Sequence, residues 1–205
     1  WKHARSLKNK HIQVIRNIAP QRVGSTCINR TQELIQTKRP FQLVYLGQIT
    51  EKKGVGELVK ALIALDNPTI GCWIVGGSEF SQPFQNQMKA LCAASTTQTE
   101  IRWVGYQNDP RPYYQAADWH IAPSRYEEPL GNVVQEAQRE STPSITSNLG
   151  GLPELIEHKQ TGWILKETSA QGIEQAIRHL ITGPKWSQTA GTKANEASLS
   201  GVTRS

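Results

Sequence analysis

The sequence has little of what marks disulfide-rich, zinc-binding or membrane-spanning proteins. It contains three cysteines among 205 residues, with no Cys-x-x-Cys pair, and five scattered histidines. These counts argue against a disulfide framework or a structural zinc site, and they favour a reducing compartment. The longest apolar runs, such as residues 72–75, have the length of strands, whereas a membrane helix needs about 18 apolar residues. We therefore expect a globular chain, which at this length buries about 70% of its unfolded surface.

Methionine is nearly missing as well. The chain begins with Trp1 and its single methionine is Met88. No secretory signal or transit pattern is visible at the start. We therefore expect a piece of a longer, cytoplasmic protein rather than a complete chain.

Acidic residues are scarce at the start of the chain. Residues 1–40 hold nine lysines and arginines and one acid, Glu33, whereas residues 41–205 hold 14 basic and 16 acidic residues. A basic stretch of this kind can be a membrane-surface or nucleic-acid patch, or a solvated helix with a linker. Because the basic residues are not interleaved with aromatic residues that stack on bases, we expect no nucleic-acid partner. Residues 1–40 are interpreted as a basic arm, a remnant of a missing neighbouring domain, with a possible strand over residues 11–18.

From Phe41 onward, strand-sized apolar runs alternate with helical periodicity, which predicts parallel β-α-β units. The expected strands are residues 43–46, 70–75, 101–104, 119–122, 143–147 and 162–165. The expected helices are residues 55–63, 84–92, 109–117, 132–140, 151–157 and 173–181. The fold class is therefore α/β: a doubly wound, six-stranded, parallel Rossmann-like sheet over residues 41–183, with helices on both faces. Residues 184–205 are weakly amphipathic and are expected to form a tail or a closing helix.

Ligands of such sheets bind beyond the carboxyl ends of the strands, and the segment after the first strand has the features of an anion site. It runs from Gly47 and Gln48 to Lys53 and Gly54, just before an expected helix. A lysine at a helix start is misplaced for the helix dipole but well placed for an anion. The segment is neither a G-x-G-x-x-G fingerprint nor a Walker A loop, which argues against nicotinamide and P-loop nucleotide chemistry.

The segment after the fourth strand contains acids on both sides of an expected helix start. Glu128 lies in the loop and Glu136 lies about one turn inside the helix, so both can flank a ligand at the helix N-terminus. Glu127 is an alternative to Glu128. The residues between them, Leu130, Gly131 and Asn132, would offer free backbone N–H groups. After the fifth strand, Gly150 and Gly151 form a third glycine-containing turn.

In this order and at these spacings, the segments resemble the C-terminal, donor-binding domain of retaining GT-B glycosyltransferases of family 4. Glu128 and Glu136 match the family's E-x(7)-E motif, which selects Glu128 over Glu127. The residues from Gly47 to Gly54 are similar to its G-R-L-x-x-x-K-G segment, and those from Gly150 to Glu154 to its Gly-Gly-x-x-E turn. The resemblance covers residues 41–183.

The resemblance implies a role for each matching residue. Lys53 would bind the donor diphosphate and stabilise it as the leaving group, Glu128 would hold hydroxyls of the donor sugar, and Glu136 would bind the ribose. The backbone of Leu130, Gly131 and Asn132 would contact the sugar and phosphate, and the backbone at Gly105 and Tyr106 would read the base. Lys53 and Glu128 are thus the catalytic candidates, and Gly47 and Gln48 complete the donor site.

The implied function is transfer of a hexose from a nucleotide-diphospho-sugar to a glycan, lipid-linked or small-molecule acceptor, in polysaccharide or glycoconjugate biosynthesis. The missing partner would be the N-terminal acceptor domain, without which the chain would be inactive, and the arm could touch a membrane surface. No cofactor or metal is expected, since the sequence has no Asp-x-Asp motif. The family's phosphate-binding arginine is replaced by Gln48, which motivates the alternative of a nucleotide- or sugar-binding module without catalysis.

Overall fold

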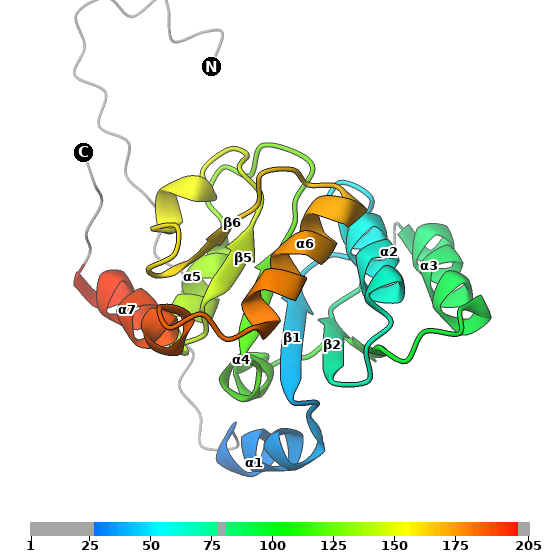
Figure 1. Cartoon of the computed structure of the whole chain (residues 1–205), viewed down its shortest axis with the longest axis horizontal. Coiled ribbons are helices and arrows are strands. Elements are labelled where there is room, and N and C mark those ends of the chain that lie inside the picture. Colours follow the sequence, from blue (N-terminus) through cyan, green and yellow to red (C-terminus); the bar gives the residue numbers. More distant parts are fainter. Residues whose placement is uncertain (1–26, 78–80, 201–205) are drawn as a thin grey trace, which may run out of the picture.

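The computed structural model describes residues 27–77 and 81–200 as a single parallel sheet covered by helices (Figure 1). Its six strands are β1 (Phe41–Leu46), β2 (Ile70–Val75), β3 (Glu100–Gly105), β4 (Trp119–Ala122), β5 (Ser144–Thr146) and β6 (Gly162–Ile164). They lie in the order β3-β2-β1-β4-β5-β6, and every pairing is parallel. This is the strand order of a Rossmann sheet, so the predicted fold class is confirmed.

An α-helix follows every strand except β5, which is followed by a 3-10 turn. The helices are α1 (Cys27–Thr37), α2 (Val55–Leu65), α3 (Gln82–Ala94), α4 (Arg111–Ala116), α5 (Asn132–Arg139), α6 (Ala170–Ile181) and α7 (Ser187–Ser200). The apolar stripe of α2 faces the sheet, and its residues Val55, Leu58 and Leu62 are fully buried. Its i, i+3, i+7 spacing is what the sequence predicted.

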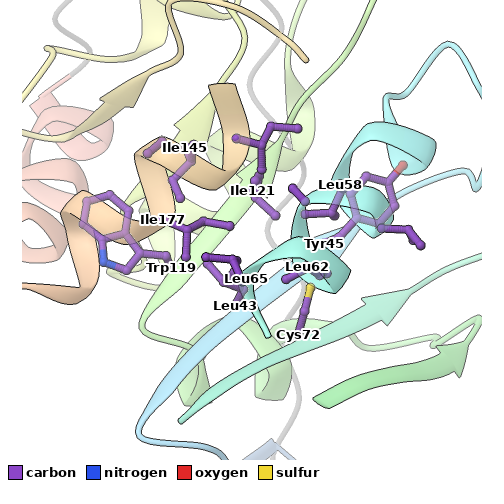
Figure 2. Packing of buried hydrophobic residues seen from close by; sticks show 14 of the residues in the cluster. Leu43, Tyr45, Leu58, Leu62, Leu65, Cys72, Trp119, Ile121, Ile145 and Ile177 are labelled. Carbon is purple, nitrogen blue, oxygen red and sulfur yellow. The ribbon is translucent and has the colours of Figure 1, made fainter. Parts of the chain in front are cut away.

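The larger core lies between the sheet and the pair α2 and α6, which pack side by side over one face (Figure 1). Figure 2 shows Leu43 and Leu65 meeting Ile177 of α6 in this layer. Alternate residues of the same strand point to the opposite face, because side chains of a strand alternate. Val44 of β1 therefore joins Trp73 in the second core, beneath α4.

The two ends of the described chain are helical and pack on this second side and its edge. Residues 27–37 of the expected arm form α1, which contacts α4 and buries Leu34. The expected tail contains α7, which lies against α5 and buries Ala190 and Ala194. The predicted strand at residues 11–18 lies outside the described residues.

One predicted helix is shorter than expected. Residues 151–157 were expected to be helical, but only Pro153–Leu155 forms a 3-10 turn. The backbone becomes extended at Ile156, whose side chain is buried against Val134 of α5. Of the helices in the described ranges, none has the length and apolar character needed to cross a bilayer.

Candidate functional site

The candidate site lies at the carboxyl ends of β1 and β4, where the strand order reverses. β1 pairs with both β2 and β4, so the chain leaves β1 in one direction and returns on its other side. Crossover helices then part on either side of this point and leave a crevice between the loops. The predicted segments after β1 and β4 meet here.

Direct backbone contact holds the two loops together. The Arg125 amide donates to the Lys52 carbonyl oxygen at 2.7 Å. Gly54 has a φ of +73°, and a Cβ atom built on it would lie 1.8 Å from the Pro123 carbonyl oxygen. Only glycine combines this backbone conformation with such a close approach, so Gly54 allows Lys53 to reach the β4 loop.

Lys53 and Glu128 meet in a closed hydrogen-bonded network. The Lys53 ammonium donates to Glu128 Oε1 in a short ion pair, and to the Tyr126 hydroxyl at 3.0 Å. The Tyr126 hydroxyl donates to Glu128 Oε2 at 2.9 Å, and Ser124 Oγ donates to Glu128 Oε1 at 2.8 Å. The ammonium also lies 5.1 Å from the centre of the Tyr126 ring, within the range of a cation–π contact.

The network keeps both groups charged although they are mostly covered. The Lys53 side chain is 24% exposed and that of Glu128 is 12% exposed. Burial alone lowers the pKa of Lys53, but its hydrogen bonds to Glu128 and Tyr126 outweigh this and raise that pKa above the usual value. Burial likewise raises the pKa of Glu128, but the hydrogen bonds it accepts, from Lys53 first, leave that pKa below the usual value. Each charge is thus stabilised by the other.

The turn after β5 fixes the backbone of Glu128 from the other side. The Gly151 amide donates to the Glu128 carbonyl oxygen at 2.7 Å. Gly150 has a φ of +60°, and a Cβ atom there would lie 2.5 Å from both the amide nitrogen and the carbonyl oxygen of Glu128. The predicted Gly-Gly turn is therefore a support for the acid rather than a separate site.

The N-terminus of α5 opens into the same crevice. Gly131 caps this helix in the left-handed conformation, with a φ of +58°. A Cβ atom at Gly131 would lie 2.8 Å from side-chain atoms of Leu152 and of Leu155. The first amides of a helix have no acceptor within it, so those of Asn132 and Val133 can serve a ligand.

Glu136 lines a neighbouring hollow of about 250 Å³. The walls also include Gly47, Gln48, Gly76 and Tyr106. Strands β1 and β2 approach closely here, because a Cβ atom on Gly76 would lie 2.0 Å from the Gly47 carbonyl oxygen. The structure thus brings Glu136 and Tyr106 to one hollow. The predicted Gly105 lies behind its wall, where its carbonyl oxygen accepts from the Gly76 amide at 2.8 Å.

Gln48 connects the two groups of predicted site residues. Gln48 is exposed and lines both this hollow and a second one of about 680 Å³, which Lys53 and Tyr126 also line. Glu127 is exposed, whereas Glu128 faces Lys53.

A larger hollow of about 810 Å³ lies between β6 and α6. It contains none of the predicted residues, so we place the site at the crevice, where the charged network lies.

Sequence reasoning missed the hydroxyl groups that hold Glu128. Ser124 and Tyr126 were assigned no role from the sequence, yet both donate to its carboxylate. No local pattern pointed to them, because residues 125 and 126 form a bend between Ser124 and Glu128 and the contacts depend on how this loop folds. Tyr114 was also given no role, and its hydroxyl lies 3.4 Å from Glu136 Oε2.

Comparison with known proteins supports the fold and identifies relatives of the chain. A sequence model of the family described as Glycosyl transferases group 1 matches residues 28–197. The lipopolysaccharide core biosynthesis glycosyltransferase LpsE of Rhizobium meliloti is 26% identical over 136 residues, which are 66% of this chain and 38% of that protein. The chain thus spans about two fifths of the length of this curated relative.

Two solved structures share the fold. Anabaena HepE in complex with UDP-glucose matches with a TM-score of 0.75 at 21% identity, over 84% of this chain and 47% of that one. The C-terminal domain of a group 1 glycosyl transferase, LpcC from Francisella tularensis, matches with a TM-score of 0.69 at 19% identity, over 86% of this chain and 93% of that one. The first match covers half of a larger chain and the second covers nearly a whole domain.

Proposed function

Because the chain belongs to the glycosyl transferases group 1 family, we propose that it is the nucleotide-sugar-binding domain of a GT-B glycosyltransferase. One observation supports this most directly: Lys53 and Glu128 form an ion pair at the switch point of the sheet, and Gln48 links the hollow lined by Lys53 to the hollow lined by Glu136. A cation, free amides and a carboxylate in one crevice suit the diphosphate and the hydroxyls of such a donor. The UDP-glucose bound to HepE is a ligand of this kind.

In this proposal, each protein group contacts either the negative charge of the donor diphosphate or the hydroxyls of the donor. As the glycosidic bond breaks, negative charge grows on the departing diphosphate, and Lys53 and the α5 amides stabilise it. Glu128 accepts hydrogen bonds from the donor sugar, Glu136 from the ribose, and the backbone at Gly105 and Tyr106 contacts the base. We further propose a retaining hexosyl transfer of family 4 type, in which the diphosphate helps to deprotonate the acceptor on the same face, without a metal.

The acceptor side belongs to the rest of the protein. LpsE and HepE are each more than twice as long as the region that this chain matches. We therefore propose an N-terminal Rossmann domain that binds a glycan, lipid-linked or small-molecule acceptor, with contact to a membrane surface. The 205-residue chain on its own is then expected to bind nucleotide but to transfer no sugar.

Calorimetric titration of this chain with UDP, GDP and ADP tests the proposal. We expect saturable binding of one nucleotide, and about tenfold weaker binding in Glu136→Ala, which is the effect of losing about 1.4 kcal/mol of charge-assisted hydrogen bonding to the ribose. Glu196→Ala, at an exposed position of α7, is the matched control and should bind like the wild type. Equal binding by all three proteins, or no binding of any nucleotide, would contradict the assignment.

Gln48 favours a second candidate, a binding module without catalysis. It stands where the family resemblance places an arginine, so one positive charge is missing beside the crevice. Acceptor-dependent transfer by the full-length protein that Lys53→Ala abolishes would exclude this candidate.

A further inference from the structure

The ammonium of Lys53 is engaged before any ligand arrives. Two of its N–H donors are directed to Glu128 and Tyr126, and a lysine ammonium has three donors and no acceptor. The carboxylate of Glu128 accepts from Lys53, Ser124 and Tyr126. The cation that the proposed function assigns to the diphosphate is therefore neutralised by the acid that it assigns to the sugar.

A nucleoside diphosphate and a nucleotide sugar differ in what they offer to Glu128. A nucleoside diphosphate offers phosphate oxygens to Lys53 but brings nothing to Glu128, whose carboxylate then loses its ammonium while it is only 12% exposed. That carboxylate also repels the diphosphate. A nucleotide sugar brings hydroxyl donors, which can replace the ammonium at Glu128 as Lys53 turns to the phosphates.

We propose that the Lys53–Glu128 pair makes this site select the nucleotide sugar over the nucleoside diphosphate. The inference rests on the proposed function and deepens it: the sugar releases Lys53 from Glu128, and the released Lys53 binds the diphosphate. When the sugar has been transferred, Glu128 recaptures Lys53, and the hold on the nucleoside diphosphate product weakens. The same pair thus favours entry of the donor and departure of the product.

The geometry allows this exchange without unfolding the loop. Tyr126 and Ser124 both donate to Glu128 independently of Lys53, so the carboxylate keeps two partners while the lysine moves. The backbone of Glu128 is fixed by Gly151. Tyr126 and Ser124 are therefore positioning residues that hold the acid in place for the sugar.

The test compares matched ligand pairs on the 205-residue chain: UDP with UDP-glucose, GDP with GDP-mannose and ADP with ADP-glucose. For the pair that binds, Glu128→Gln should bind the nucleoside diphosphate about fivefold more tightly, the factor that corresponds to about 1 kcal/mol for a partly exposed ion pair. It should bind the nucleotide sugar more weakly, so that the wild-type preference is lost. A gain in affinity cannot come from misfolding.

Glu127→Gln is the matched control, since it removes the same charge from the neighbouring exposed side chain. It should leave the preference unchanged. Tyr126→Phe keeps the ring beside Lys53 but removes the hydroxyl, so it should shift the preference in the same direction as Glu128→Gln and by less. It also serves as the test if Glu128→Gln does not fold.

The outcomes separate the two proposals. Weaker or unchanged binding of the nucleoside diphosphate by Glu128→Gln, with tight binding by the wild type, overturns the inference and leaves the proposed function standing. Failure of the wild type to bind any of the six ligands overturns both.

Discussion

Single glycines set how closely the loops of this site approach one another. At Gly54 and Gly150 the backbone has a positive φ, and an added Cβ atom would meet main-chain atoms of the β4 loop at 1.8 Å and 2.5 Å. Main-chain atoms cannot swing aside as the end of a long side chain can. The position of Lys53 relative to Glu128 therefore depends on two residues that have no side chain.

Gly54→Ala should consequently be one of the most damaging small substitutions in the chain. We expect the free energy of unfolding to fall by about 2–4 kcal/mol, through backbone strain and displacement of the loop. Urea unfolding followed by circular dichroism measures it. Gly77→Ala is the control, because an added Cβ there has no described atom within 4 Å. Equal stability of the two variants would show that the loops separate easily.

At the scale of elements, α7 shows how a helix can be held without large apolar side chains. Its buried face consists of Ala190 and Ala194, with Gly191 between them. A Cβ atom on Gly191 would lie 2.1 Å from the Ser141 carbonyl oxygen, and the Asn195 amide group donates to the Arg139 carbonyl oxygen at 2.6 Å. The helix is therefore fixed by close backbone approach and by capping of the end of α5.

Ala190→Leu should push α7 off the larger core, to which Ala190 belongs. Because Ala190 is fully buried, we expect a loss of about 1–3 kcal/mol in the free energy of unfolding from over-packing. Thr192→Leu, on the exposed side of the same helix, should change it by less than about 0.5 kcal/mol. Thermal and urea unfolding of the two variants give the comparison, and a stable Ala190→Leu protein would mean that α7 is loosely attached.

The elements also show where prediction from sequence succeeds. Strands such as Ile70–Val75 are apolar throughout and are followed by glycine, so their existence and their succession along the chain could be predicted. The docking of α7 was not, because a stripe of alanine and glycine gives no amphipathic signal. The 3-10 turn at Pro153–Leu155 is short because the buried Ile156 needs an extended backbone, which local sequence does not reveal.

The sequence could predict which residues belong to the candidate site, but not the contacts between them. The spacing of Glu128 and Glu136 and the glycine before α2 located the acids and Lys53. The contacts of Tyr126 and Ser124 with Glu128 depend on how two distant loops face one another, and that information lies in the tertiary structure.

At the scale of the whole molecule, stability depends on a histidine in the centre of the sheet. His120 lies fully buried on β4, with Nδ1 2.9 Å from Ser144 Oγ and its ring 5.5 Å from that of Tyr114. Burial lowers the pKa of His120 to about 3. The folded sheet therefore holds this imidazole neutral.

Stability should decrease in acid for this reason. Below pH about 6.5 the unfolded chain takes up a proton at His120 that the folded chain does not, so the free energy of unfolding falls by up to about 1.4 kcal/mol per pH unit until the folded pKa is reached. Burial lowers the pKa of His158 too, so this residue also contributes to the pH dependence. The contribution of His120 is therefore isolated by comparing the wild type with His120→Gln. That variant should show a shallower slope than the wild type between pH 6.5 and 4 in urea unfolding. Identical slopes in the two proteins would refute the assignment.

The pairing of β1 with β4 determines at what stage of folding the candidate site assembles. Leu43 pairs with Trp119 across the sheet, so Lys53 and Glu128 meet only after a long stretch of chain has closed into a loop. Contacts of such separation form late in folding. During synthesis, a nascent chain that ends before residue 128 has β1 and Lys53 but no acid to pair with it. Under the proposed function, nucleotide binding would report that β1 and β4 have paired, and a bound donor would stabilise the finished domain rather than its folding intermediates.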